Sequence, residues 1–191
     1  MDARVEYREA ESTVVTLRSG RRIGVVKYGD PFGVPVLAIH GAPACRTMFE
    51  AADAQARAGG VQLIAFDRPG YGLTPLDYGA TLQSRTEVFA ELADTLGLDR
   101  FALLGVSGGG PYAVALAARL GSRIAGLALV SPLGPVADGA SRSVPNPVHL
   151  STAQRGFFLD LAHHPWLLRC NAEAVMRSFR IAPGLFLSTV S

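Results

Sequence analysis

A serine flanked by glycines is the residue best suited to chemistry in this chain. Ser107 lies in the run Gly105-Val106-Ser107-Gly108-Gly109, which fits the pattern Gly-x-Ser-x-Gly. A nucleophile held on a sharp strand-to-helix turn forces strained backbone angles, so its neighbours must lack bulky side chains. We therefore predict that Ser107 attacks a carbonyl carbon. The N–H of Gly108, at the start of the following helix, would then bind the oxygen that becomes negative.

A second loop carries a candidate donor to the same oxygen. His40-Gly41-Ala42-Pro43 follows the apolar run Val36–Ile39. In a parallel sheet this loop would lie beside the turn that holds Ser107. The backbone N–H of Ala42 is therefore the predicted second oxyanion donor, and we assign His40 to the loop rather than to acid–base chemistry.

A third polar loop, Asp67-Arg68-Pro69-Gly70-Tyr71-Gly72, follows the apolar run Val61–Phe66. Two interpretations are open for Asp67 and Arg68: a direct part in catalysis, or a turn in which they brace neighbouring loops. Bracing is the simpler interpretation, and we expect it.

The glycines after Ser107 also allow a different interpretation. Residues 108–113 fit the dinucleotide-binding pattern Gly-x-Gly-x-x-Ala. That function requires an acidic residue at the end of the next strand to hold the ribose. No Asp or Glu occurs between Asp99 and Asp138, so the nucleophile is favoured over the dinucleotide site.

The elements that must position these loops alternate in type. Short apolar runs predict strands and longer periodic stretches predict helices. The strands are Val36–Ile39, Val61–Phe66, Phe101–Gly105 and Ile124–Val130, and the helices are Met48–Ala58, Thr81–Leu96 and Pro111–Leu120. Because the strands are continuously apolar, we expect a sheet buried on both faces. Two β-branched segments, 13–17 and 22–27, predict an antiparallel hairpin before it. The fold class is α/β, a mostly parallel doubly wound sheet with this N-terminal hairpin.

The helix over 81–96 is the most clearly marked. Thr81 is placed to cap its first turn and Gly97 to end it. Its apolar face is predicted to contain Leu82, Phe89, Leu92 and Leu96.

The pattern changes after Val130. Residues 131–150 contain four prolines, and two helical stretches follow, one capped by Ser151 with Gln154 and one starting at Pro165. We therefore predict two parts, a sheet-containing core over residues 1–135 and a helical segment over 136–191.

Composition excludes several function classes. Lys and Arg number 18 against 16 Asp and Glu, for a net charge of +2, and no basic cluster stands out. Nucleic-acid and anionic-membrane partners are therefore not expected. The charged start and the lack of a long apolar run predict a soluble, cytoplasmic protein. Cys45 and Cys170 lack the spacing of a metal site, so we expect half-buried or buried thiols and neither a metal nor a cofactor.

The three loops resemble, in order and spacing, those of the α/β-hydrolase family. The resemblance covers the first hairpin through about Pro132. It implies an acyl-enzyme mechanism on a carboxylic ester or similar bond, with Ser107 as nucleophile and the N–H groups of Ala42 and Gly108 as oxyanion donors. The helices over 151–180 would be the start of the family's variable cap. One departure is Ala44-Cys45, where relatives often carry a small pair such as Gly-Ser.

The family mechanism also needs an acid and then a His after the nucleophile. The carboxylates and histidines after residue 107 are Asp138, Asp160, Glu173, His149, His163 and His164. Asp160 has helical spacing to His163 and His164, so the residues could interact. A solvated helix end explains this spacing better than a catalytic pair directed at Ser107. Asp138 stays open as a displaced acid, and no histidine is a credible base.

Two further strand–helix units would need roughly 50 to 60 residues, and only 183–191 follow the second helix. We expect an incomplete sheet, either in a fragment or truncated product or in a chain completed by a partner. Such a chain would be nearly inactive, with a rate enhancement of at best roughly 10³- to 10⁴-fold over the reaction in water.

The predicted function is thus hydrolysis of a small-molecule acyl substrate of apolar character. The alternative is a non-catalytic remnant or binding module with the same fold. Homo-oligomer formation is compatible with either. The sequence does not identify the substrate-binding residues.

Overall fold

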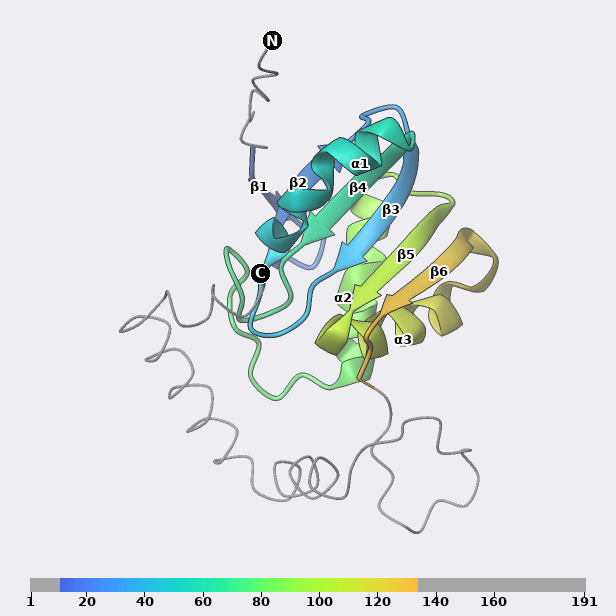
Figure 1. Ribbon diagram of the computed structural model, residues 1–191. Coiled ribbons are helices and arrows are strands. Elements are labelled where there is room, and N and C mark those ends of the chain that lie inside the picture. Colours follow the sequence, from blue (N-terminus) through green and yellow to red (C-terminus); the bar gives the residue numbers. More distant parts are fainter. Residues whose placement is uncertain (1–10, 134–191) are drawn as a thin grey trace, which may run out of the picture. The chain divides into compact units, whose positions relative to one another are not determined.

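The computed structural model describes residues 11–133 (Figure 1). Six strands form one sheet in the order β1-β2-β4-β3-β5-β6. The strands are β1 (Thr13–Thr16), β2 (Arg22–Gly29), β3 (Val34–Ile39), β4 (Val61–Phe66), β5 (Phe101–Val106) and β6 (Ile124–Val130). The helices are α1 (Asp53–Ala58), α2 (Leu82–Thr95) and α3 (Gly110–Leu120), with 3-10 helices η1 (Arg46–Ala52), η2 (Ser107–Gly109) and η3 (Gly121–Arg123).

The predicted mix of parallel and antiparallel strands is confirmed. β3 pairs in parallel with β4 and β5, and β5 pairs in parallel with β6. β1 and β2 form the predicted antiparallel hairpin, and β2 also runs antiparallel to β4. In the register, Ile39 at the end of β3 lies opposite Phe66 of β4 and Gly105 of β5. The loops that follow these three strands therefore leave the sheet at one edge, which brings their polar residues together.

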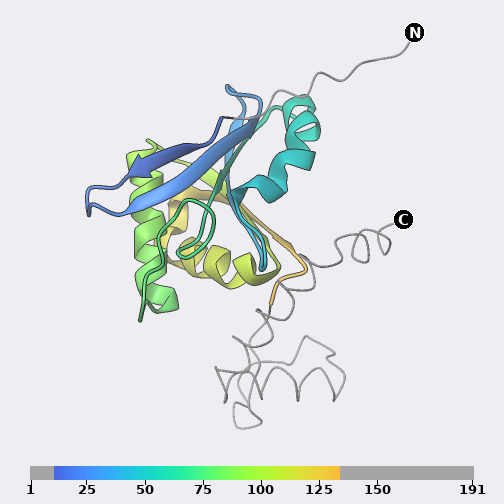
Figure 2. The ribbon, with the colours of Figure 1, turned by 90° about the vertical axis from the view of Figure 1, so that its left-hand side faces the viewer.

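Helices cover both faces of the sheet, with α1 on one side and α2 and α3 on the other (Figures 1 and 2). Alternate residues of each central strand enter different apolar clusters. Leu37 and Ile39 pack with buried residues of α2 and α3, whereas Ala38 packs with Phe49 of η1. This two-sided burial explains why the central strands are continuously apolar in sequence.

The expectation of burial on both faces is wrong for β6. From Ala125 to Val130 the strand is exposed, with Leu127 at 42% and Val130 at 51%. Within residues 11–133, β6 is the last strand on its side of the sheet and has only β5 as a neighbour. An edge strand has fewer packing partners, so an apolar sequence alone does not predict its burial.

Helix α2 shows the predicted caps. Thr81 Oγ1 accepts a hydrogen bond from Ser84 N at 3.1 Å, and Ser84 Oγ accepts one from Thr81 N at 2.9 Å. Gly97 follows the helix with φ +69°, a conformation suited to glycine after a helix end. Phe89 and Leu92 are fully buried, but Leu82 is 45% exposed. Leu82 is the first residue of the helix, before the helix reaches the core.

The helix predicted over 48–58 is in fact two pieces, the 3-10 helix η1 and the short α1. Cys45 is the N-cap residue of η1, and its side chain forms no capping hydrogen bond with the backbone of that helix. The other predicted strand and helix bounds agree within two residues.

Cys45 is half-buried and unbridged, as expected, whereas Cys170 and the helical segment predicted over 136–191 lie outside the described residues. No helix within residues 11–133 is long and apolar enough to cross a membrane.

Candidate active site

The turn after β5 has the geometry expected of a nucleophile elbow, a name used below for residues 105–110. β5 ends at Val106, Ser107 begins η2, and α3 starts at Gly110. Ser107 has φ +49°, which costs an L-residue roughly 1–2 kcal/mol. Its side chain is half-buried and forms no hydrogen bond with residues 11–133. The part of the chain that the structure describes thus leaves this hydroxyl without a hydrogen-bond partner.

Close packing explains the glycines of the elbow. A Cβ on Gly105 would lie 2.8 Å from Ala113 Cβ and 2.9 Å from Gly110 Cα. A Cβ on Gly109 would overlap the carbonyl oxygen of Ile39. Only residues without side chains let α3 lie this near β5 and β3.

The loop after β3, which we call the oxyanion loop (residues 40–43), lies against the elbow. A Cβ on Gly41 would lie 3.0 Å from Ser107 Cβ and 3.6 Å from Ser107 Oγ. A Cβ on Gly108 would lie 3.8 Å from the N of Ala42. The structure therefore brings together Ser107, Ala42 and Gly108, the three residues singled out from the sequence. The Ala42–Pro43 peptide bond is cis.

Two backbone N–H groups near Ser107 have no hydrogen-bond partner within residues 11–133 and could bind an oxygen. The N–H of Ala42 forms no hydrogen bond with any residue of the described part. Gly108 is the second residue of η2, and N–H groups of a helix's first turn have no partner inside the helix. Such donors suit an oxygen that gains negative charge.

His40 is held as a neutral structural residue. It is fully buried, its Nδ1 donates to the carbonyl oxygen of Gly41 at 2.7 Å, and its Nε2 accepts from Arg68 N at 3.0 Å. Burial is the main cause that lowers the pKa of His40 to about 4, and the charge of Arg68 acts in the same direction. With both nitrogens engaged by backbone groups, His40 has no site left for a proton from Ser107.

The loop after β4 contains a tightly bonded carboxylate, and we call residues 67–74 the aspartate turn. Asp67 is fully buried. Its carboxylate accepts hydrogen bonds from Arg46 N at 2.8 Å, Arg46 Nη1 at 2.7 Å and Leu73 N at 2.8 Å. Thr74 Oγ1 donates to the carbonyl oxygen of Asp67 and accepts from Gly24 N, each at 3.0 Å. Asp67 therefore braces the turn, as the sequence predicts.

Arg68 points the other way, toward the candidate site. Its Nη2 donates to the carbonyl oxygen of Gly41 at 2.8 Å, and its Nη1 lies 3.4 Å from that of Gly108. The guanidinium also lies over the rings of Tyr71 and Tyr112, at 4.7 and 5.3 Å from their centroids. The sequence indicated that Arg68 braces a neighbouring loop. It did not indicate which atoms it binds, because these contacts link three loops that are 27 and 40 residues apart.

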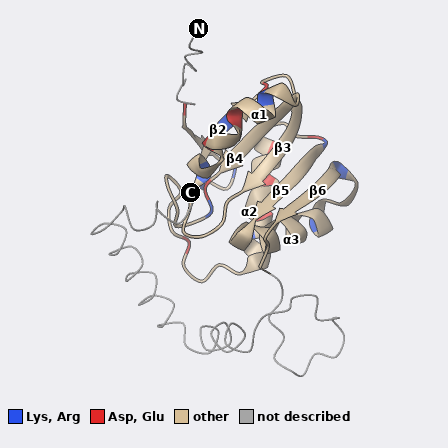
Figure 3. Ribbon diagram, viewed as in Figure 1, with Lys and Arg blue, Asp and Glu red and all other residues tan. Residues whose placement is uncertain are grey.

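The remaining candidates for the acid and the base are not placed. Asp138, Asp160 and Glu173 lie outside the described residues, as do His149, His163 and His164. No group of three or more His, Cys, Asp or Glu suited to a metal occurs within residues 11–133. Charged residues of both signs are spread over several elements (Figure 3).

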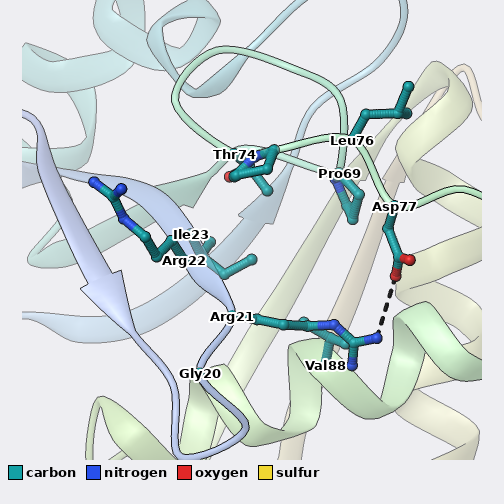
Figure 4. Close-up of a pocket in the computed structure, with 10 residues that line it drawn as sticks. Gly20, Arg21, Arg22, Ile23, Pro69, Thr74, Leu76, Asp77 and Val88 are labelled. Atoms are coloured by element: carbon teal, nitrogen blue, oxygen red, sulfur yellow. Dashed lines mark hydrogen bonds and ion pairs between the residues drawn. The ribbon is translucent and has the colours of Figure 1, made fainter.

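A pocket of about 290 Å³ lies away from the elbow, between the β1–β2 turn, the aspartate turn and α2 (Figure 4). Ile23, Pro69 and Val88 supply part of its apolar lining, and Arg21 and Asp77 pair across its edge at 3.4 Å. Neither Ser107 nor Ala42 lines it. It is therefore distinct from any substrate site at Ser107.

Comparison with known proteins agrees with this geometry. The model of the family described as alpha/beta hydrolase fold matches residues 34–164. Haloalkane dehalogenase 2 of Mycobacterium tuberculosis and that of Mycobacterium bovis are each 29% identical over 166 residues, covering 82% of this chain and 58% of theirs. The chain thus spans less than two thirds of the length of these curated relatives.

Solved structures show the same fold. An alpha/beta hydrolase fold protein from Nakamurella multipartita is 31% identical, with a TM-score of 0.60, over 81% of this chain and 53% of that one. An esterase from Exiguobacterium antarcticum is 28% identical, with a TM-score of 0.57, over 64% of this chain and 46% of that one. Both structures therefore share the fold of the part of this chain that they cover.

Proposed function

The chain belongs to the α/β-hydrolase family, and we propose that it is a hydrolase that cleaves carboxylic esters or similar acyl bonds through Ser107. The observation that carries the proposal is the juxtaposition at the elbow. A serine hydroxyl and the N–H of Ala42, neither of them hydrogen-bonded to any residue of 11–133, lie beside the first-turn N–H of Gly108.

The reaction follows from these groups. Ser107 Oγ bonds to the carbonyl carbon, and the electron pair of the C=O bond moves to the oxygen, where Ala42 N–H and Gly108 N–H hold it. As the tetrahedral intermediate collapses, the bond to the alcohol oxygen breaks, the alcohol leaves with the proton that the base took from Ser107, and an acyl ester of Ser107 remains. Water then adds to that ester and releases the carboxylic acid.

The proton of Ser107 needs an acceptor that the described residues do not provide. His40 is the one histidine within residues 11–133, and backbone groups engage both of its nitrogens. We therefore assign the base to a residue that is not among residues 11–133.

The nucleophile favours an acyl substrate over an alkyl halide, although two relatives are haloalkane dehalogenases by name. Enzymes of that kind use a carboxylate nucleophile, which forms an ester whose carbonyl water can attack. Attack by Ser107 on an alkyl halide would leave an ether, which has no such carbonyl. The esterase from Exiguobacterium antarcticum, similar to this chain, fits the acyl chemistry better.

Covalent labelling tests the proposal. The chain is incubated with a fluorophosphonate and its intact mass is measured. We expect one phosphonyl group per chain, located on Ser107 by peptide mapping, and no mass gain in Ser107→Ala. Ser122→Ala, which removes an exposed serine in η3, is the matched control and should label like the wild type.

Two results would count against a serine hydrolase. A wild-type chain that gains no mass would favour the alternative of a non-catalytic protein with this fold. Equal labelling of the wild type and of Ser107→Ala would place the reactive group elsewhere.

A further inference from the structure

Arg68 is a buried cation that no carboxylate neutralises within the described residues. It is 6% exposed, and it forms no ion pair with any Asp or Glu of residues 11–133. The nearest carboxylate in sequence, Asp67, is taken up by Arg46. The rings of Tyr71 and Tyr112 supply its stacking partners. Within the described residues, its guanidinium contacts these two rings and the carbonyl oxygens of Gly41 and Gly108.

The group that Arg68 binds best belongs to the oxyanion loop. The carbonyl oxygen of Gly41 accepts from Arg68 Nη2 at 2.8 Å and from His40 Nδ1 at 2.7 Å. That carbonyl is part of the same peptide group as the N–H of Ala42. Two donors on the oxygen fix the plane of this peptide and so fix the direction of the Ala42 N–H.

The same two hydrogen bonds polarise the peptide. Donors at the oxygen draw electron density from the nitrogen, and one of them is charged, so the opposite N–H becomes a stronger donor. The 3.4 Å contact from Arg68 Nη1 to the carbonyl oxygen of Gly108 holds the second oxyanion residue beside the first.

We propose that Arg68 is a positioning residue of the oxyanion site, which orients and polarises the Gly41–Ala42 peptide so that Ala42 N–H binds the negative oxygen more strongly. The proposal rests on the acyl-transfer function proposed above. Arg68 itself does not touch the substrate.

The test compares three variants. Arg68→Met removes the charge and the donors at similar length, and Arg68→Lys keeps a charge and one donor. Arg85→Met is the matched control, since Arg85 is a half-buried arginine that also reaches Tyr112, by a 3.1 Å hydrogen bond to its hydroxyl. Within residues 11–133, Arg85 forms no hydrogen bond with the oxyanion loop or the elbow.

The first readout is the second-order rate constant for fluorophosphonate labelling of Ser107, with the melting temperature measured in parallel. Loss of a whole oxyanion donor slows such reactions roughly 10²- to 10³-fold. Because Arg68 acts through a donor that stays in place, we expect Arg68→Met to slow labelling about 10- to 100-fold. Arg68→Lys should recover part of the rate, and Arg85→Met should stay within about twofold of the wild type.

The second readout is the amide resonance of Ala42 in ¹⁵N-labelled protein. A weaker hydrogen bond at the Gly41 oxygen should move the Ala42 proton and nitrogen shifts upfield in Arg68→Met and less so in Arg68→Lys. A role confined to stability would lower the melting temperature without moving this resonance in a folded sample.

The outcomes separate the two proposals. If the wild type does not label, the proposed function fails, and the Ala42 resonance alone decides the role of Arg68. If the wild type labels, a wild-type rate in Arg68→Met overturns the inference. An unshifted Ala42 resonance in both folded Arg68 variants also overturns it.

Discussion

The aspartate turn and the elbow lie at the same edge of the sheet but use their residues in opposite ways. In the aspartate turn, three donors occupy the carboxylate of Asp67, and Thr74 both donates and accepts. In the elbow, Ser107 Oγ has no hydrogen-bond partner among residues 11–133. A fully bonded polar group holds a loop in place, whereas an unengaged one is available to a substrate.

Backbone strain divides the two loops in the same way. In the aspartate turn, the residues with positive φ are Gly70 at +87° and Gly72 at +51°. Glycine adopts such angles without steric cost. The elbow places Ser107 at +49° instead. Of these two loops, the elbow is the one that places a non-glycine residue at positive φ, and that residue is the proposed nucleophile. Ser131, after β6, is a second such residue with φ +43°. The aspartate turn is thus framework, and the elbow is the part to which we assign the proposed chemistry.

The largest effect should come from breaking the framework. Asp67→Ala leaves Arg46, whose side chain is 10% exposed, without its partner. Loss of one member of a buried pair costs about 3–5 kcal/mol in the free energy of unfolding, measured by urea denaturation. Asp94→Ala removes a carboxylate that is 40% exposed and pairs with Arg123 at 2.8 Å, and it should cost less than about 1 kcal/mol. Equal costs would refute the view that the aspartate turn carries the framework.

His40 of the oxyanion loop is linked to the aspartate turn by the hydrogen bond that it accepts from Arg68 N, and its ionisation should break this link. Its folded-state pKa of about 4 lies below the ordinary 6.5, so the unfolded chain takes up a proton first as the pH falls. The free energy of unfolding should therefore lose about 3 kcal/mol from this group between pH 6.5 and pH 4. Above pH 6.5 its contribution is constant.

His40→Gln, which cannot titrate, isolates this contribution. Urea denaturation of both proteins at pH 7 and at pH 4.5 should show a smaller fall for the variant, and His40→Asn provides a second non-titrating side chain if Gln does not fold. An equal fall in the free energy of unfolding for wild type and variant would show that the folded protein can take up a proton on His40 without this loss.

The smallest effect concerns the strain at the elbow. Ser107→Gly and Ser107→Ala both remove the nucleophile, but only glycine adopts φ +49° without cost. Ser107→Gly should be more stable than Ser107→Ala by about 1 kcal/mol, because relief of strain exceeds the added flexibility of the unfolded chain. Thermal or urea denaturation measures the difference. A less stable Ser107→Gly would mean that the elbow is not strained.

Local patterns predicted much of the fold. The caps of α2 at Thr81 and Gly97 and the elbow around Ser107 depend on residues a few positions apart, so the sequence shows them directly. The 3-10 geometry of η1 and the exposure of β6 were not predicted. A helical pattern does not distinguish 3-10 from α geometry, and the apolar run of β6 does not show what packs against it.

The candidate site was predicted in its parts but not in its connections. Ser107, Ala42 and Gly108 follow from motifs, because each loop ends a neighbouring parallel strand. The pairing of Asp67 with Arg46 and the binding of Arg68 to the Gly41 carbonyl depend on the distances between separate loops. Sequence spacing carries no information on those distances.

The most direct test of the oxyanion site is a crystal structure of the phosphonylated protein. The adduct on Ser107 presents a phosphoryl oxygen in the place of the oxyanion. We predict that this oxygen lies about 2.7–3.1 Å from both the N of Ala42 and the N of Gly108. An adduct on Ser107 whose phosphoryl oxygen points away from both N–H groups would contradict the account.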